Sequence, residues 1–199
     1  MNAIRIAITG THSTGKSTFC NSAAESLTKR GFKVGRVSDL ATAARDHGFP
    51  ILREHTHDST LWIITQGIAN ELVAALSNDV VIVDRGVPDA LGYWLAALEH
   101  RGETAKSDEL TRISSIVRAH TSSYHLLFNT VLNRELPLGE NQERDKDMHF
   151  RESAEKHIVS TLQEIGASPI PLNNGGIESA VDLVVALVEH NRNQSNPSV

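Results

Sequence analysis

A stretch near the N-terminus, GTHSTGKST at residues 10–18, has the composition and spacing of a loop that binds phosphate. Gly10 and Gly15 let the backbone curl so that successive N–H groups point at phosphate oxygens, and the helix expected to follow adds its positive end. Lys16 would neutralise β- and γ-phosphate oxygens, and the Ser17 hydroxyl would bind Mg²⁺. The sequence therefore predicts a nucleotide site that comprises Gly10, Thr11, His12, Ser13, Thr14, Gly15, Lys16, Ser17 and Thr18.

An aspartate and an arginine follow one another at the end of a second apolar run. VVIVD, residues 80–84, reads as a buried parallel strand that would deliver Asp84 to the Mg²⁺. A motor ATPase would be expected to have a glutamate next, to orient water, but this chain has Arg85. Arginine cannot act as a base, yet it can hold a phosphate through two hydrogen bonds, which favours transfer over hydrolysis. A helix cap for Asp84 and a surface salt bridge for Arg85 are the alternative roles.

Short apolar segments alternate with helical patterns along the chain, which is typical of an α/β fold with a parallel sheet. We expect strands at residues 3–9, 33–38, 80–84, 124–130 and 169–172, and helices at residues 16–30, 59–77, 88–99, 109–120, 150–165 and 177–190. Residues 1–190 are predicted to form one domain, and the polar residues 191–199 a flexible tail.

The composition narrows the class of partner. A net charge of −5 over 199 residues disfavours a nucleic-acid backbone or an anionic membrane as the main partner and fits a small molecule better. The N-terminus has too few apolar residues for a signal peptide, and no run of about 18 apolar residues that could span a membrane occurs. We therefore expect a cytoplasmic protein. The single cysteine, Cys20, excludes a disulfide framework. The oligomeric state stays open, with a homodimer as one arrangement.

The loop, the Asp84–Arg85 pair and the arginine-bearing polar segment after the fourth strand together resemble the P-loop small-molecule kinases. Gln66, Glu71 and DRGVPDALGY at residues 84–93 are more closely similar to the NadR-like branch, with its nicotinamide riboside kinase domain, and to its deoxynucleoside and thymidylate kinase relatives. The resemblance implies a three-layer fold around a five-stranded parallel sheet in the order 2-3-1-4-5. It also implies an acceptor region at about residues 39–77 and a lid at about residues 133–151 that closes over ATP.

Asp39 ends the expected second strand, where the resemblance places a carboxylate for the acceptor hydroxyl. A carboxylate within hydrogen-bond reach orients such a hydroxyl or removes its proton. An acceptor that already carries a phosphate needs cations instead, and Arg45 and Arg53 could supply them. A capping role for Asp39 and solvated surface roles for both arginines are the alternatives. The residues leave the choice between hydroxyl and phosphate acceptors open.

Three further side chains are candidates for the acceptor site. Gln66 lies in an apolar helical segment, and a helical glutamine at a comparable place in deoxynucleoside kinases pairs with the base. Trp62 could stack on that base. The alternatives are bonding to nearby backbone for Gln66 and packing in the core for Trp62. Asp89 either orients Arg85 or caps its own helix.

The polar segment at residues 132–151 supplies the candidate lid cations Arg134, Arg144, Lys146 and Arg151. Arg144 and Arg151 are seven residues apart, so both can face one side of a helix and reach the transferred phosphoryl group. A solvated surface helix is the competing interpretation. Of the ten histidines, His55 and His57 lie close together, but without a third spaced ligand they favour the acceptor pocket over a zinc site.

Together these features predict an ATP- and Mg²⁺-dependent P-loop kinase for a small acceptor, with a nucleoside or a compound such as nicotinamide riboside as the first choice. A nucleoside monophosphate kinase is the near alternative, and an ATP-binding regulatory module with slow ATPase activity is the alternative of another class. The donor base, ATP or GTP, is open. The candidate catalytic residues are Lys16, Asp39, Arg85, Arg144 and Arg151, and the candidate acceptor contacts are Asp39, Arg45, Trp62, Gln66, Arg85 and Asp89.

Overall fold

A five-stranded parallel sheet organises the computed structural model, which describes residues 3–132 and 148–195. The strand order is β2-β3-β1-β4-β5, which confirms the order implied by the resemblance. The strands are β1 (Ile4–Thr9), β2 (Val34–Val37), β3 (Val80–Asp84), β4 (Leu126–Thr130) and β5 (Ile170–Leu172), and each falls within an expected segment.

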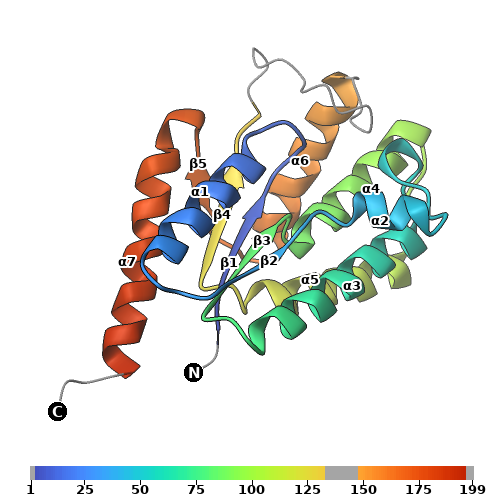
Figure 1. The fold of residues 1–199 in the computed structure, drawn as a ribbon. Helices are drawn as coiled ribbons and strands as arrows, with labels where there is room; N and C mark the ends of the chain where they lie inside the picture. The colour runs from blue at the N-terminus through green and yellow to red at the C-terminus, as the bar shows by residue number, and fades with distance from the viewer. Residues whose placement is uncertain (1–2, 133–147, 196–199) are drawn as a thin grey trace.

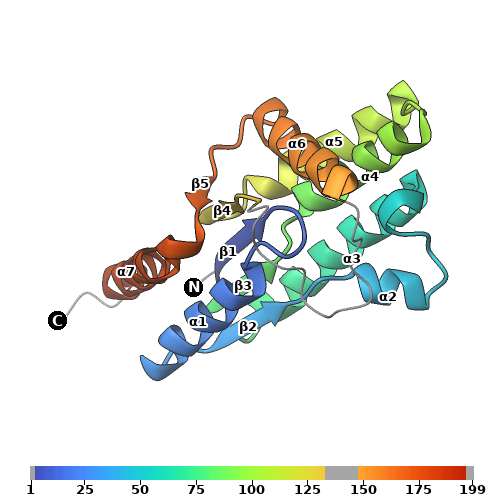
Figure 2. The same cartoon turned by 90° about the horizontal axis from the view of Figure 1, so that it is seen from above.

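Helices cover both faces of the sheet (Figures 1 and 2). The helices α1 (Lys16–Lys29) and α7 (Ile177–Ser195) pack on one face. The other side carries α3 (His57–Ala75), α4 (Val87–Arg101), α5 (Ser107–Thr121) and α6 (Met148–Glu164). No helix in the described ranges is long and apolar enough to cross a membrane.

The central strand β1 has apolar side chains on both faces of the sheet, so helices must cover both faces. Ile4, Ile6 and Ile8 point to the face covered by α1 and α7, whereas Ala7 packs in the cluster on the opposite face. Apolar side chains on both faces are typical of a parallel strand buried between helices. In the parallel register Ile8 lies beside Asp84, so the ends of β1 and β3 meet at one edge of the sheet.

The segment between β2 and α3 differs from the expectation, which gave it no helix. It contains α2 (Ala41–Asp46) and the 3₁₀ turn η1 (Leu52–Glu54). Both are too short to show a helical period in the sequence. Outside this segment, helix ends differ from the expected ones by a few residues; α4, for example, continues to Arg101 and ends at Gly102, whose φ of 68° suits glycine. The last helix, α7, continues to Ser195, so residues 191–195, which were expected to belong to the tail, are helical. Most of the predicted lid, residues 133–147, lies outside the described residues.

Candidate active site

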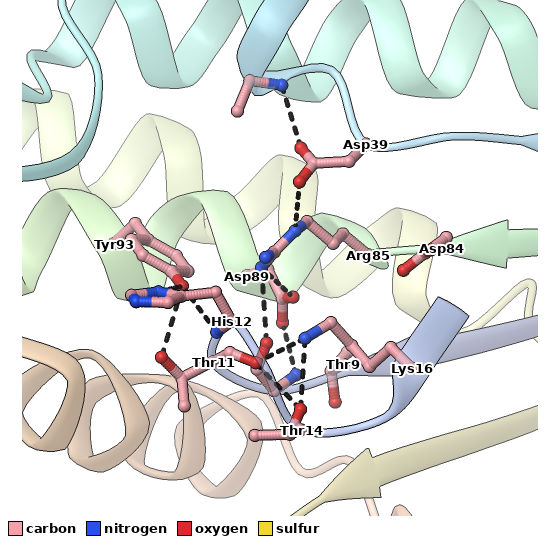
Figure 3. Close-up of polar contacts among 12 residues, drawn as sticks. Thr9, Thr11, His12, Thr14, Lys16, Asp39, Asp84, Arg85, Asp89 and Tyr93 are labelled. Atoms are coloured by element: carbon pink, nitrogen blue, oxygen red, sulfur yellow. Dashed lines mark hydrogen bonds and ion pairs between the residues drawn. The ribbon is translucent and has the colours of Figure 1, made fainter. Parts of the chain in front are cut away.

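The phosphate loop, residues 10–18, runs from the end of β1 into the first turn of α1 (Figure 3). Gly10, Ser13 and Gly15 have φ values of 128°, 60° and 89°. Gly10 has a second constraint, because a Cβ there would lie 2.1 Å from the Thr130 hydroxyl oxygen on β4. The first N–H groups of a helix have no acceptor within it, so α1 presents donors and the positive end of its dipole to the loop. This arrangement suits an anion.

Lys16 is buried inside the loop. Its ammonium group donates to the Thr11 carbonyl and, at 3.3 Å, to the Thr14 hydroxyl. Burial and, to a smaller extent, the nearby charge of Arg85 lower the pKa of Lys16 from 10.5 to about 8, against the opposing effect of the carboxylates of Asp89, Asp84 and Asp39. Phosphate oxygens would offer this ammonium group negative partners in place of two neutral ones, and so would favour its charged form.

Ser17 and Asp84 meet where β1 and β3 end. The Ser17 hydroxyl donates to the Asp84 carboxylate at 2.7 Å. A hydroxyl and a carboxylate are the oxygen ligands that Mg²⁺ prefers, and Mg²⁺ usually takes only one or two protein carboxylates besides water and phosphates. The described residues contain no group of three or more His, Cys, Asp or Glu side chains that could hold a metal ion by themselves. The pair therefore fits the predicted Mg²⁺ position.

Arg85 follows Asp84 and links the site together. Its backbone has a φ of 76°, which a non-glycine residue adopts rarely. The Nε group donates to Asp39 Oδ2 at 2.6 Å, and Nη1 lies 3.4 Å from both Asp89 Oδ2 and the Gly10 carbonyl (Figure 3). The strained backbone thus aims the guanidinium at the space between the end of β2 and the phosphate loop.

Asp89 anchors the loop from the first turn of α4. Its Oδ1 accepts the Gly10 N–H at 3.0 Å, and its side chain also contacts Arg85. The helix cap is Gly86, so Asp89 orients Arg85 rather than capping the helix. Burial raises the pKa of Asp89 to about 7, against the opposing charges of Arg85 and Lys16. A continuous chain of contacts therefore runs from Asp39 through Arg85 and Asp89 to Gly10.

Tyr93, to which the sequence analysis gave no role of its own, holds the middle of the phosphate loop. Its hydroxyl oxygen accepts the His12 N–H at 3.0 Å and lies 3.3 Å from the Thr11 hydroxyl. The centroid of its ring lies 5.5 Å from the Arg85 guanidinium carbon. The signal in the sequence was spacing, because Tyr93 is four residues after Asp89 and so shares its helix face.

Arg151, on α6, touches the same part of the loop. Its side chain is fully buried, and Nη2 donates to the His12 carbonyl at 3.2 Å. One turn further along α6, Glu155 accepts the Thr11 N–H at 3.4 Å. Of the two lid arginines proposed as catalytic, Arg151 therefore lies at the phosphate loop, whereas Arg144 lies outside the described residues.

A cavity of about 600 Å³ extends from the phosphate loop past Arg85 to η1 and α3. Asp39, Asp89 and Tyr93 line it, together with apolar side chains such as Ile63 and Ile64. Its size is that of a site for a small organic molecule. Phosphate-binding groups therefore occupy one part of this cavity and apolar groups another.

Glu71 also lines the cavity, but its buried carboxylate is already engaged. It accepts hydrogen bonds from His120 Nε2 at 2.8 Å and from the Tyr124 hydroxyl at 3.0 Å. This carboxylate therefore ties α3 to α5 and the start of β4.

Three residues predicted to contact the acceptor lie outside the cavity lining. Arg45 is on α2, with a side chain that is 45% exposed and an ion pair to Asp46. Trp62 packs against the rings of His47 and Phe49. Gln66 donates to Asn70 at 2.8 Å, one turn further along α3. Arg53 is not part of the lining either.

Comparison with known proteins assigns the chain to a class. A family model described as an AAA domain matches residues 5–180, and the chain belongs to that family. No curated protein matches the sequence.

Two solved structures share the fold more specifically. Thymidylate kinase from Candida albicans superposes with a TM-score of 0.64 at 14% identity, over 96% of this chain and 93% of the other. A NadR protein in complex with NR superposes with a TM-score of 0.62 at 16% identity, over 92% of this chain but only 50% of that longer chain. The predicted resemblance to the NadR-like and thymidylate kinase-like branch of P-loop proteins is confirmed at the level of the fold.

Proposed function

We propose that this protein transfers the γ-phosphoryl group of ATP, with Mg²⁺, to a hydroxyl group of a small acceptor. The acceptor is a nucleoside or a nucleoside-like compound such as nicotinamide riboside. The observation that carries the proposal is the position of Asp39. Its carboxylate lies in the cavity that begins at the phosphate loop, 2.6 Å from the Arg85 guanidinium.

The charges in the cavity favour a hydroxyl over a phosphate as the acceptor group. Among the described residues that line it, Lys16 and Arg85 are the cationic side chains of arginine and lysine type. Lys16 belongs to the phosphate loop, and Arg85 is already paired with two carboxylates. A second phosphate beside Asp39 would meet a negative charge, whereas a hydroxyl can donate a hydrogen bond to it. Arg45 and Arg53, the cations considered for such a phosphate, are not in the lining.

Asp39 acts in this proposal by orienting the hydroxyl. Burial alone raises the pKa of Asp39, but Arg85 and the Ala41 N–H outweigh that effect and bring the pKa below its usual range. The carboxylate is therefore ionised at neutral pH and is a weak base. It accepts the hydrogen bond of the hydroxyl and takes the proton as the bond from the hydroxyl oxygen to the γ-phosphorus forms and the bond to the β–γ bridging oxygen breaks.

The remaining charged groups stabilise the transferred phosphoryl group. Lys16 and the donors at the start of α1 bind β- and γ-phosphate oxygens, and Arg85 is placed between loop and acceptor. Mg²⁺ held by Ser17 and Asp84 would supply further positive charge to the same oxygens. The apolar walls at Ile63 and Ile64 suit the flat ring of a nucleoside.

The experiment is a transfer assay with purified protein, γ-labelled ATP and Mg²⁺. The panel contains ribonucleosides, deoxynucleosides, nicotinamide riboside and the corresponding monophosphates. The proposal expects label to pass to at least one unphosphorylated acceptor and not to its monophosphate. Label transfer to monophosphates alone, or release of inorganic phosphate without any labelled ester, would refute it.

A further inference from the structure

His55 is a buried side chain in the wall of the cavity whose ring nitrogens are unused. The residue is 4% exposed and precedes α3. Neither Nδ1 nor Nε2 has a hydrogen-bond partner within residues 3–132 and 148–195. Buried polar side chains nearly always have a partner, because losing water without gaining one is costly. Both nitrogens therefore remain to be satisfied.

The backbone around His55 is held in place from outside the cavity. Leu52, which shares the cavity wall, has a φ of 58° that disfavours leucine. Arg101, at the end of α4, donates to the carbonyls of Arg53 and His55, the latter at 3.1 Å. Strained backbone of this kind persists where its surroundings fix it, and it is common at ligand sites.

The neighbouring histidine is a useful contrast. His57 pairs Nδ1 with Asp58 at 2.9 Å, leaves only Nε2 without a partner among the described residues, and makes an edge contact with the ring of Trp94. It is not part of the cavity lining. The structure thus separates the two histidines of the REHTHD segment, and only His55 shares a cavity with Asp39.

The surroundings of His55 set its charge. Burial is the main cause that lowers the pKa of His55, and Arg101 and Arg85 also lower it; against the opposing effect of Asp39, the pKa falls to about 4. At neutral pH the ring is therefore uncharged, with one nitrogen as a donor and the other as an acceptor. Such a ring matches an uncharged polar group and offers no charge to a phosphate.

We propose that His55 is a specificity-determining residue that hydrogen-bonds an uncharged group of the acceptor, either a sugar hydroxyl or an amide of the base. This inference rests on the proposed function. It deepens that proposal, because it assigns recognition of the acceptor to a side chain separate from Asp39 and Arg85, which act at the transferred group.

The test compares His55→Phe, His55→Gln and the control His57→Phe in the full chain. Phenylalanine keeps the ring next to Tyr93, whose centroid lies 6.3 Å away, but removes both nitrogens. We expect His55→Phe to raise the KM for the acceptor about tenfold while the KM for ATP stays unchanged. The Tm should not fall, because the substitution removes unpartnered polar atoms. His55→Gln keeps a donor and an acceptor and should retain most of the affinity, and His57→Phe should leave the acceptor KM unchanged.

Analogues identify which acceptor group His55 contacts. If it is a sugar hydroxyl, the wild-type preference for a ribonucleoside over its 2′-deoxy or 3′-deoxy counterpart disappears in His55→Phe. If it is an amide, that preference persists, and the preference for nicotinamide riboside over an analogue without the carboxamide disappears instead. Either result supports the proposal.

The outcomes that overturn the inference differ from those that overturn the function. An active wild-type enzyme together with an unchanged acceptor KM in His55→Phe would overturn the role of His55 and leave the proposed function standing. A lower Tm with unchanged acceptor KM would assign His55 to the core, with the same consequence. A wild-type protein that phosphorylates no acceptor would overturn the proposed function and this inference with it.

Discussion

Replacing Asp39 by asparagine keeps the shape of the side chain and removes its charge beside Arg85. The amide oxygen can still accept the Ala41 N–H, which lies 2.9 Å from Asp39 Oδ1, so the turn between β2 and α2 is retained. The 2.6 Å ion pair with Arg85 is lost. The Asp39 side chain is 42% exposed and that of Arg85 19% exposed, but Arg85 keeps its contact with Asp89 in the variant, so loss of the pair should lower the free energy of unfolding by about 1 kcal/mol and the Tm should change little.

The effect on catalysis should be much larger. A positioned acid or base contributes a factor of roughly 10²–10⁴ to the rate. Arg85 helps to hold the pKa of Asp39 below its usual range, so Asp39 is a weak base and belongs at the lower end of that range. We therefore expect Asp39→Asn to lower kcat by about 10², which corresponds to about 2.7 kcal/mol of transition-state stabilisation.

The assay is steady-state turnover at saturating ATP and Mg²⁺ with a nucleoside that the wild-type protein phosphorylates. Asp46→Asn is the matched control, since it removes the same charge from α2 at a side chain that is 66% exposed and outside the cavity lining. The control should change kcat by less than about twofold.

A kcat for Asp39→Asn within about threefold of the wild-type value would refute the assigned role. It would mean that the acceptor group needs no carboxylate beside it, which is the behaviour expected of a phosphate acceptor. Loss of the fold in Asp39→Asn, seen as a fall in Tm that Asp46→Asn does not show, would contradict the small stability contribution derived above.

Three further expectations concern metal, protons and pH. Ser17→Ala should raise the Mg²⁺ concentration for half-maximal activity at least about tenfold, because it removes one of the two oxygen groups that we propose to bind the metal. A metal titration with an unchanged midpoint would contradict this. ADP binding at pH 8 should take up about half a proton, because Lys16 has a pKa of about 8 in the free protein and becomes fully charged beside phosphate. Calorimetry in buffers of different ionisation enthalpy measures this proton uptake, and zero uptake at pH 8 would count against the expectation. Asp89 has a pKa of about 7 in the folded protein, raised from 3.8, so its protonated form favours folding at low pH. This contribution to the free energy of unfolding, at most about 4 kcal/mol, is lost as the pH rises from about 4 to 7. Urea unfolding of Asp89→Asn should lack this loss, and identical pH profiles for the two proteins would disprove it.

Much of the architecture could be predicted because its signals are local. Apolar runs such as VVIVD mark buried parallel strands, and the phosphate loop has a fixed spacing of glycine, lysine and serine. The segment between β2 and α3 could not be predicted in this way. Its helix α2 has six residues and its turn η1 has three, so neither carries a hydrophobic period.

The site was predictable where a strand end fixes the position. Asp39, Asp84 and Arg85 each follow or end a strand, and the structure brings them to one edge of the sheet. Trp62 and Gln66 depend on the rotation of α3 about its axis, which the sequence does not determine. The structure turns Trp62 toward Phe49 and Gln66 toward Asn70.

Residues that act through long-range contacts had the weakest signals. Tyr93 reaches His12 across 81 positions, and Arg101 reaches His55 across 46. No spacing rule connects such pairs, because the contacts arise only when α4 packs beside the phosphate loop and η1.

The central claim is that the acceptor group is a hydroxyl beside Asp39. A single competition experiment tests it most directly: purified protein with ATP and Mg²⁺ is given an equimolar mixture of a nucleoside and its monophosphate, and the products are read by mass spectrometry. The proposal predicts that the monophosphate increases at the expense of the nucleoside and that no diphosphate forms. Conversion of the monophosphate to the diphosphate with the nucleoside left intact would contradict the claim.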